Sequence, residues 1–229
     1  MSQVSVEDAT DFLSVLPNVS FTCGPVTLVV PTFTQTLALA KHLYNGLWDS
    51  PADSTLGRTW YSENATDRGR MILAYYMDAW VTYNRPNAPL AFAALVNNEV
   101  VGYQGLEGFK AFWQTREAET VSWISKDSRG RKFAIPMRYA ALHIGFSVLG
   151  ANVMRSGALV QNRASQVVSE RCGYDWDGTE TQAVGEYVDH GIRYRLSREK
   201  WDTWDRPDVV CTGAQDLYEW FCQRHPMGK

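Results

Sequence analysis

The sequence predicts an α+β fold, with one mixed, mostly antiparallel sheet of about seven strands and helices on both faces. Two pairs of short apolar runs, each flanking turn-forming residues, are typical of antiparallel hairpins. Between these pairs a strand, a helix and another strand alternate, which is typical of a parallel crossover. With 229 residues and 45% hydrophobic content, the chain is long enough for one well-buried core.

The N-terminal part of the chain supplies one strand and one main helix. Residues 1–23 are polar and mixed, with a short helix expected near 6–16. The apolar run 26–30 predicts a strand that a proline closes. Residues 34–47 carry apolar side chains at helical spacing, and the Gly, Pro, Asp and Ser residues of 48–57 then predict a loop.

The middle of the chain continues with a helix and a hairpin. Apolar residues at three-to-four spacing predict a helix over 67–83. The apolar runs 90–96 and 100–106 flank Asn97 and Asn98. Because asparagine tolerates the left-handed backbone of a tight turn, we expect these two runs to form an antiparallel pair.

Strands and helices alternate in the next part. Strands are predicted over 118–124 and 152–160, and helices over 133–148 and 164–172. The first of these helices has one apolar face, made of Met137, Ala141, Ile144 and Val148.

The C-terminal part ends in a hairpin and an aromatic-rich stretch. The hairpin is expected to join 179–188 to 192–196, with its turn at His190 and Gly191. Beyond it, residues 211–224 place three large apolar side chains on one helical face, namely Leu217, Trp220 and Phe221.

A basic turn separates the strand that ends at Ile124 from the helix after it, and it contains Arg129, Gly130, Arg131 and Lys132. The first amides of a helix lack intrahelical partners, and together with the positive end of the helix dipole they attract an anion. Gly130 lets the backbone approach that anion, and the three cations add charge beside it. This turn is therefore predicted to bind a diphosphate.

A second motif follows one helix and one strand later. Asn162 and Ser165 begin a predicted helix that ends at Gly173 and Tyr174. In this order, the two motifs resemble the GNAT superfamily of acyl-CoA-dependent N-acetyltransferases over residues 90–201. Within it, the chain is similar to the RimJ- and RimL-like branch, which acetylates the N-termini of ribosomal proteins.

The basic turn departs from the family pattern at one position. The family's pyrophosphate loop reads Arg/Gln-x-x-Gly-x-Gly/Ala, and Arg129 and Ala134 match its ends. Lys132 stands where the middle glycine is usual, and Pro136 is expected in the second turn of the following helix. Together they indicate a reshaped loop.

The resemblance implies the GNAT fold, in which two neighbouring strands splay apart and the pantetheine of acetyl-CoA, the acyl donor, lies in the gap. The backbone of Trp123, Ile124 and Ser125 would bind this pantetheine. The remaining residues implied to bind the donor are Arg129, Gly130, Arg131, Lys132, Phe133, Ala134, Asn162 and Ser165.

Acetyl transfer needs a base, because an alkylammonium with a pKa of about 10 has to lose a proton. By resemblance, Glu119 matches the glutamate that many members of this branch carry in this strand. Glu117 and Glu107 are the alternatives. Since charged residues usually lie at the surface, the alternative for Glu119 and Glu117 is that both are solvated strand or loop residues.

The departing thiolate needs a hydrogen-bond donor. By resemblance, Ser165 matches the serine that related enzymes set near the CoA sulfur, with Asn162 holding the pantetheine. Many GNAT enzymes carry a tyrosine further along this helix that acts as the general acid, and this chain has Ser169 at that position. The structural alternative is that Asn162 caps the helix and Ser165 is only its neighbour.

Composition argues against several classes of protein. A net charge of −3 is a poor match to a duplex-DNA binder, so a nucleic-acid partner is not expected. No apolar run approaches the roughly 20 residues that span a bilayer, and the N-terminus lacks a signal-peptide pattern, so we expect no membrane partner and a cytoplasmic protein. Four scattered cysteines favour free thiols, and four histidines without ligand spacing predict no metal.

The chain is predicted to divide into an N-terminal segment (1–23), an acyltransferase domain (24–201) and a C-terminal extension (202–229). The extension has three candidate positions: on the sheet, over the acceptor cleft, or against a second subunit in a homodimer. The leading hypothesis is an N-acetyltransferase that moves acetyl from acetyl-CoA to a primary amine by direct attack. The alternatives are a CoA-binding or non-catalytic interaction protein, and a transferase with an unusual donor or a nucleobase acceptor.

Overall fold

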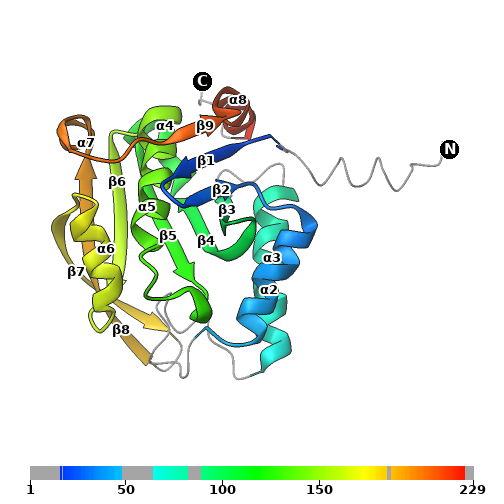
Figure 1. The fold of residues 1–229 in the computed structure, drawn as a ribbon. Coiled ribbons are helices and arrows are strands. Elements are labelled where there is room, and N and C mark those ends of the chain that lie inside the picture. The colour runs from blue at the N-terminus through cyan, green and yellow to red at the C-terminus, as the bar shows by residue number, and fades with distance from the viewer. Residues whose placement is uncertain (1–15, 17, 48–63, 82–88, 185–186, 225–229) are drawn as a thin grey trace.

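The computed structural model describes residues 16, 18–47, 64–81, 89–184 and 187–224, which fold around a nine-stranded sheet (Figure 1). The strands are β1 (Ser20–Cys23), β2 (Val26–Val29), β3 (Leu90–Val96), β4 (Glu99–Glu107), β5 (Glu117–Ile124), β6 (Val153–Leu159), β7 (Asp175–Val184), β8 (Tyr187–Ser197) and β9 (Val210–Thr212). The helices are α2 (Phe33–Tyr44), α3 (Ala65–Val81), α4 (Phe112–Thr115), α5 (Ala134–His143), α6 (Arg163–Arg171), α7 (Arg198–Thr203) and α8 (Ala214–Arg224).

The sheet has the order β7-β8-β6-β5-β4-β3-β2-β1-β9. Of the described strand pairs, β5 with β6 is parallel and the others are antiparallel. The prediction of a mixed, mostly antiparallel sheet is therefore confirmed, and β1 and β9 add two strands to the seven expected.

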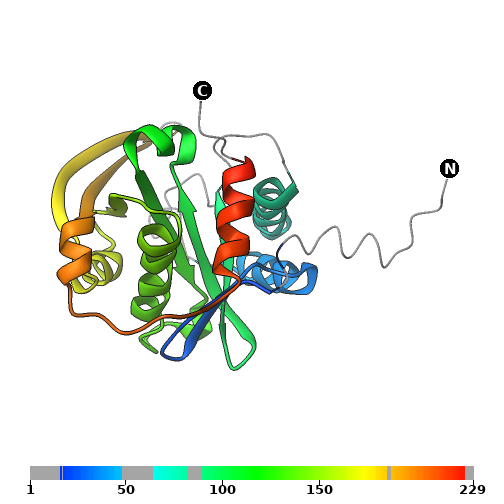
Figure 2. The ribbon, with the colours of Figure 1, turned by 90° about the horizontal axis from the view of Figure 1, so that it is seen from above.

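Helices cover both faces of the sheet (Figure 2). Helix α5 packs against β1, β2, β4 and β5, whereas α2 and α3 pack against β3 and β4 on the opposite side. Side chains along β5 alternate between these faces. Ser122 bonds to Arg138 of α5, while the ring of Trp123 lies 6.4 Å from that of His42 on α2.

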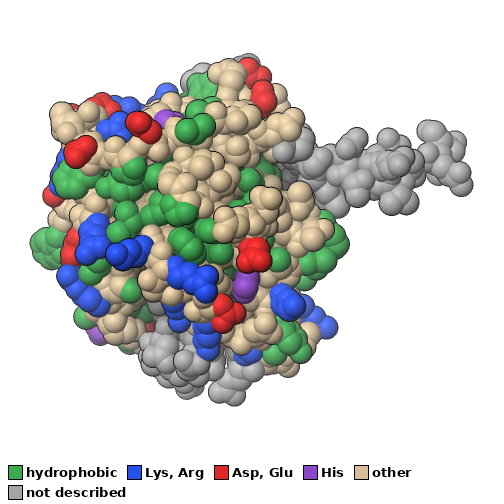
Figure 3. Space-filling view, viewed as in Figure 1, with side chains coloured by type: hydrophobic (Ala, Val, Ile, Leu, Met, Phe, Trp, Pro, Cys, Tyr) green, Lys and Arg blue, Asp and Glu red, His purple; other side chains and the backbone are tan. Residues whose placement is uncertain are grey.

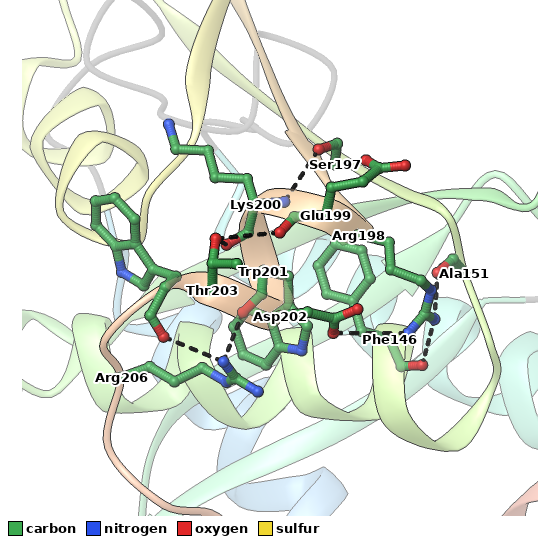
Figure 4. Close-up of polar contacts among 11 residues, drawn as sticks. Phe146, Ala151, Ser197, Arg198, Glu199, Lys200, Trp201, Asp202, Thr203 and Arg206 are labelled. Atoms are coloured by element: carbon green, nitrogen blue, oxygen red, sulfur yellow. Dashed lines mark hydrogen bonds and ion pairs between the residues drawn. The ribbon is translucent and has the colours of Figure 1, made fainter.

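The predicted helix over 133–148 has two parts. It is α-helical from Ala134 to His143 and continues as a π-helical turn, η5 (Ile144–Val148). Pro136 falls in the first turn rather than the second, where its missing N–H removes no backbone bond. At the other end, the side chain of Arg198 on α7 donates to the carbonyls of Phe146 and Ala151 (Figure 4). It thereby supplies partners at a helix end that lacks intrahelical ones.

The turn predicted at His190 and Gly191 is wrong, because both residues lie inside β8. They pair with Thr181 and Glu180 of β7, and the pairing runs on to Val184 and Tyr187. A Cβ placed on Gly191 would lie 3.1 Å from Cγ of Glu180. The glycine therefore marks a close approach of two strands and not a turn.

Both outer segments of the described chain join the sheet. Strand β9 pairs with β1, and the buried ring of Phe221 on α8 lies 4.9 Å from that of Phe109. The C-terminal residues thus pack on the sheet, the first of the three expected positions. The division at residues 23 and 201 stays a prediction, although the sheet extends across both positions. Apart from Leu16, the helix expected near 6–16 lies outside the described residues, as does the loop over 48–57.

Candidate active site

Strands β5 and β6 separate partway along their length. Their parallel pairing ends with Thr120 and Ser156. Beyond that pair, β5 stays bonded to β4 as far as Ile124, and β6 stays bonded to β8 as far as Leu159. A cavity of about 1050 Å³ opens where the two strands diverge, as the predicted splay requires.

The wall of this cavity is basic near the end of β5. The lining residues there come from the turn before α5 and from α6: Arg129, Gly130, Lys132, Phe133, Ala134, Asn162, Arg163, Ser165 and Arg171. Figure 3 shows Lys and Arg side chains beside apolar surface on the face that carries α6 and the start of α5.

The turn before α5 combines left-handed backbone with amides that lack helical partners. Gly130 and Lys132 both adopt positive φ angles, +75° and +64°, so the lysine takes the conformation that glycine usually provides. The first α5 bond runs from Met137 N to Phe133 O, which leaves the amides of Ala134 and Ile135 without helical partners. These amides belong to residues that line the cavity.

The cations of this turn differ in position. The guanidinium of Arg129 donates to the Leu47 carbonyl at 2.6 Å while the residue also lines the cavity. Arg131 is exposed and does not line it. Arg163 and Arg171 of α6 were not predicted, and Arg163 is held by Glu170 at 2.6 Å.

Two of the three predicted backbone contacts face the cavity. Trp123 and Ile124 line it, whereas Ser125 is buried and its amide donates to the Val101 carbonyl at 2.9 Å. The Ser125 amide is therefore already used within the sheet.

The second motif, Asn162 and Ser165, caps α6 and also faces the cavity. The side chain of Asn162 caps α6 by accepting a hydrogen bond from Ser165 N at 3.1 Å. Both residues line the cavity. Ser169 is fully buried, donates to Ser156 Oγ at 3.3 Å and lies outside the cavity lining.

Glu119 lines the cavity on the face of the sheet that carries α2 and α3. It is exposed to water inside the cavity but surrounded by protein, and this incomplete hydration is the main cause that raises its pKa. The carboxylates of Glu107 and Glu180 raise the pKa further, while Arg155 and Arg138 oppose them. In the described part of the chain, no hydrogen bond engages the Glu119 carboxylate, so it can accept a proton.

The alternative carboxylates are engaged. Glu107 lines the cavity, and burial raises its pKa although the Tyr75 hydroxyl donates to it. That hydroxyl also lies 2.8 Å from the Tyr103 hydroxyl. Glu117 lies outside the cavity lining and forms an ion pair with Arg155 at 2.8 Å. Glu119 is therefore the carboxylate with a free proton-accepting face.

Glu180 is an acidic residue that sequence reasoning missed. A Cβ placed on Gly157 would lie 3.6 Å from Glu119 Oε1 and 3.9 Å from Glu180 Oε1, so both carboxylates flank this glycine. With Glu107, they make the wall acidic on the side opposite α5. The signal would have been Gly157 and Gly191, whose missing side chains leave room for a carboxylate.

Arg138 was also missed. It lies on α5, is 3% exposed and lines the cavity. Its guanidinium donates to Ser156 Oγ at 2.8 Å and to Ser122 Oγ at 3.2 Å. The sequence did contain a signal for this residue. Arg138 and His143 are the two ionisable basic residues in the mostly apolar run 134–146, and a buried helix face rarely carries arginine.

Within the described ranges, no three His, Cys, Asp or Glu residues are grouped to hold a metal ion. No helix in those ranges combines the length and apolar character needed to cross a bilayer.

Comparison with known proteins gives a family match and a set of similar folds. A family model described as "Acetyltransferase (GNAT) domain" matches residues 34–175, which is more than half of the chain. Mycobacterium smegmatis RimJ in complex with CoA-disulfide is 14% identical, with a TM-score of 0.58 over 88% of this chain and 92% of that one. RimL, a ribosomal L7/L12 alpha-N-protein acetyltransferase in complex with CoA, is 15% identical, with a TM-score of 0.59 over 77% and 96%.

A third similar structure is a chimera of the spermidine N-acetyltransferase SpeG from Vibrio cholerae and hSSAT. It is 17% identical, with a TM-score of 0.59 over 79% of this chain and 100% of that one. At these identities the similarity establishes a common fold.

Proposed function

The chain belongs to the GNAT acetyltransferase family, and from that premise we propose that it transfers an acyl group from a coenzyme A thioester to a primary amine. The observation that carries this proposal is the cavity at the splay, which joins a basic turn to an unengaged carboxylate. Acetyl-CoA is the simplest donor, and a small molecule, a peptide or a protein N-terminus can supply the amine.

The donor would bind with its diphosphate at the turn before α5. The amides of Ala134 and Ile135 and the cations Arg129 and Lys132 would contact that anion, and all four residues line the cavity. Its pantetheine would extend along the separated part of β5, as an added strand would. From Glu119 to Ile124 this strand spans roughly 17 Å, a suitable distance between diphosphate and reacting carbon.

Glu119 would act as the base. An acceptor enters as an ammonium, which the carboxylates of Glu107, Glu119 and Glu180 attract. A raised pKa makes Glu119 a stronger base than an ordinary carboxylate, and filling the cavity would remove water and raise the pKa further. The neutral amine then attacks the thioester carbonyl directly.

Ser165 would donate a hydrogen bond to the departing thiolate. It lines the cavity, and no described group accepts a hydrogen bond from its hydroxyl. We assign the reaction to the cytoplasm, since the four cysteines are unpaired, as expected in a reducing compartment.

The proposal is tested by incubating the protein with acetyl-CoA and a panel of primary amines while measuring the release of free CoA thiol. Binding of CoA is followed separately by the shift of the thermal unfolding midpoint. Stabilisation by CoA together with amine-dependent thiol release supports the proposal. Absence of stabilisation at saturating CoA contradicts it.

A further inference from the structure

Arg138 is a buried cation placed where β5 and β6 separate. Ser156 belongs to the last parallel pair of the two strands, and Ser122 lies beyond it on β5. Because the guanidinium donates to both hydroxyls, it spans the opening of the splay on the face that carries α5. Arg138 also lines the cavity that opens there.

Arg138 forms no close ion pair with a described carboxylate, although its charge acts on Glu119 at longer range and lowers the pKa of that residue. The neighbours of Arg138 are neutral: the guanidinium donates to the hydroxyls of Ser156 and Ser122 and lies 5.9 Å from the centre of the Tyr174 ring. Its Nε is buried without an acceptor. The described ion pairs involve other arginines and lysines, such as Arg155 and Arg163. Burying a guanidinium is costly unless an anion compensates it, so this position fits an anionic ligand group.

The cavity has charges of opposite sign on its two sides. Glu119 lies on the α2 and α3 face, where the amine would enter, and Arg138 lies on the α5 face. The Thr120 and Ser122 side chains that line the cavity beside Arg138 are polar as well. An acetyl methyl group would place an apolar surface against this polar wall.

We propose that the acyl group of the preferred donor ends in a carboxylate, as in the CoA thioester of a short dicarboxylic acid, and that Arg138 binds this carboxylate. The inference rests on the acyl transfer proposed above and specifies its donor. The guanidinium fork would bind the carboxylate through charge-assisted hydrogen bonds. Arg138 is then a specificity-determining residue that contacts the donor.

The reaction leaves the distal carboxylate unchanged. The amine nitrogen forms a bond to the thioester carbonyl carbon, and the carbon–sulfur bond breaks with its electron pair on sulfur. The ammonium loses two protons on its way to the amide: Glu119 accepts the first before attack and releases it to solvent, and the second protonates the departing CoA thiolate. The product is an amide with a free carboxylate, so the acceptor changes from a cation to an anion.

The experiment compares four ligands on the full chain by isothermal titration: CoA, acetyl-CoA, butyryl-CoA and succinyl-CoA. The last two have the same number of acyl carbons and differ in the terminal carboxylate. We expect succinyl-CoA to bind at least about tenfold more tightly than butyryl-CoA, as one charge-assisted contact provides. Equal or weaker binding of succinyl-CoA to the unaltered protein overturns the inference without any variant.

Variants then assign the preference to Arg138. Arg138→Met keeps the length of the side chain and should abolish the succinyl-over-butyryl preference while retaining CoA binding. Arg138→Lys should restore part of it. Lys132→Met serves as the matched control, since it removes a cavity cation at the basic turn and should weaken all four ligands by the same factor. A preference that survives Arg138→Met overturns the assignment.

Thiol release with the amine panel separates the two proposals. Transfer from acetyl-CoA or butyryl-CoA at a kcat/KM equal to that from succinyl-CoA supports the acyltransferase and overturns the carboxylated donor. A succinyl-CoA preference in binding without transfer to any amine supports the donor site and contradicts the acyltransferase.

Discussion

Glu107 and Glu119 lie directly opposite each other in the antiparallel pair of β4 and β5. Burial raises the pKa of each carboxylate, and the charge of Glu107 raises the pKa of Glu119 further. Tyr75 donates to Glu107 and thereby stabilises the ionised form of that residue. The pair thus divides into an engaged carboxylate and one that remains available for proton transfer.

Replacing Glu119 by glutamine should lower turnover by about 100-fold or more, because a general base typically contributes that much. The affinity for CoA should stay near that of the unaltered protein, since the basic turn lies at the other end of the separated strand. Steady-state kinetics and CoA titration measure the two quantities. Glu117→Gln is the matched control on the same strand, and its ion pair with Arg155 predicts a loss of stability with turnover retained. Full turnover of Glu119→Gln across the pH range would assign the base to another group.

The same substitution should stabilise the folded protein at neutral pH. Because the folded-state pKa of Glu119 lies above its ordinary value of 4.5, the folded state holds the proton more tightly than the unfolded state. The resulting stabilisation is complete below about pH 4.5 and is lost as the pH rises through the raised pKa. Urea unfolding at several pH values should give Glu119→Gln a larger free energy of unfolding than the unaltered protein at neutral pH. The difference should shrink as the pH is lowered. A constant difference at every pH would contradict this.

Removing the side chain of Arg129 should weaken CoA binding by about tenfold, since a charge-assisted contact to phosphate is lost. The substitution also breaks the hydrogen bond to the Leu47 carbonyl, so the turn loses its connection to the residues after α2. Titration of CoA into Arg129→Ala gives the change in affinity. Arg131→Ala removes a neighbouring cation that does not line the cavity, and a smaller change is expected there. Equal losses in both variants would show a general effect of charge.

Lys132 holds a left-handed backbone at a φ of +64°. Lys132→Gly and Lys132→Ala both remove the ammonium, but only glycine relieves the unfavourable conformation, which costs about 1–2 kcal/mol for other residues. Glycine also makes the unfolded chain more flexible, which offsets part of this gain. We expect the glycine variant to exceed the alanine variant by about 1 kcal/mol in the free energy of unfolding. An alanine variant of equal or greater stability would contradict the strain.

Arg198→Met should lower the free energy of unfolding by about 2 kcal/mol, because the buried carbonyls it serves lose a charged donor. These carbonyls belong to Phe146 in η5 and to Ala151 after it. Thermal unfolding measures the effect. Arg193→Met is the control, since the side chain of this exposed arginine donates to one backbone carbonyl, that of Asp177 on β7. Comparable losses in both variants would argue against a special role for Arg198.

Seven of the nine strands and the two motifs were predictable because their signals are local. The hairpin at Asn97 and Asn98 forms as expected, with positive φ at both residues. The basic turn before α5 and the capping of α6 by Asn162 likewise depend on neighbouring residues. Gly191 misled the prediction because glycine serves both turns and close strand contacts, and only the pairing with Glu180 distinguishes them.

Features that depend on contacts between distant segments were not predictable. Arg138 and Ser122 are brought together by the packing of α5 on the sheet. The periodicity of a sequence does not indicate which strand residue a given helix residue will contact. Strand β9 consists of three exposed residues, so it has no apolar pattern that would predict a strand. Its partner β1 lies near the other end of the sequence. Glu180 reaches Glu119 only because two glycines on intervening strands lack side chains.

The pairing of β1 with β9 joins the first described strand to the last. During synthesis on the ribosome, β1 and β2 can form a hairpin early, but the outer edge of β1 stays unpaired until β9 has been made. The rings of Phe109 and Phe112 also lack their cover by Phe221 until α8 follows. A nascent chain stalled before residue 210 would therefore expose both an open strand edge and an aromatic surface, which are the features that chaperones recognise and that promote aggregation.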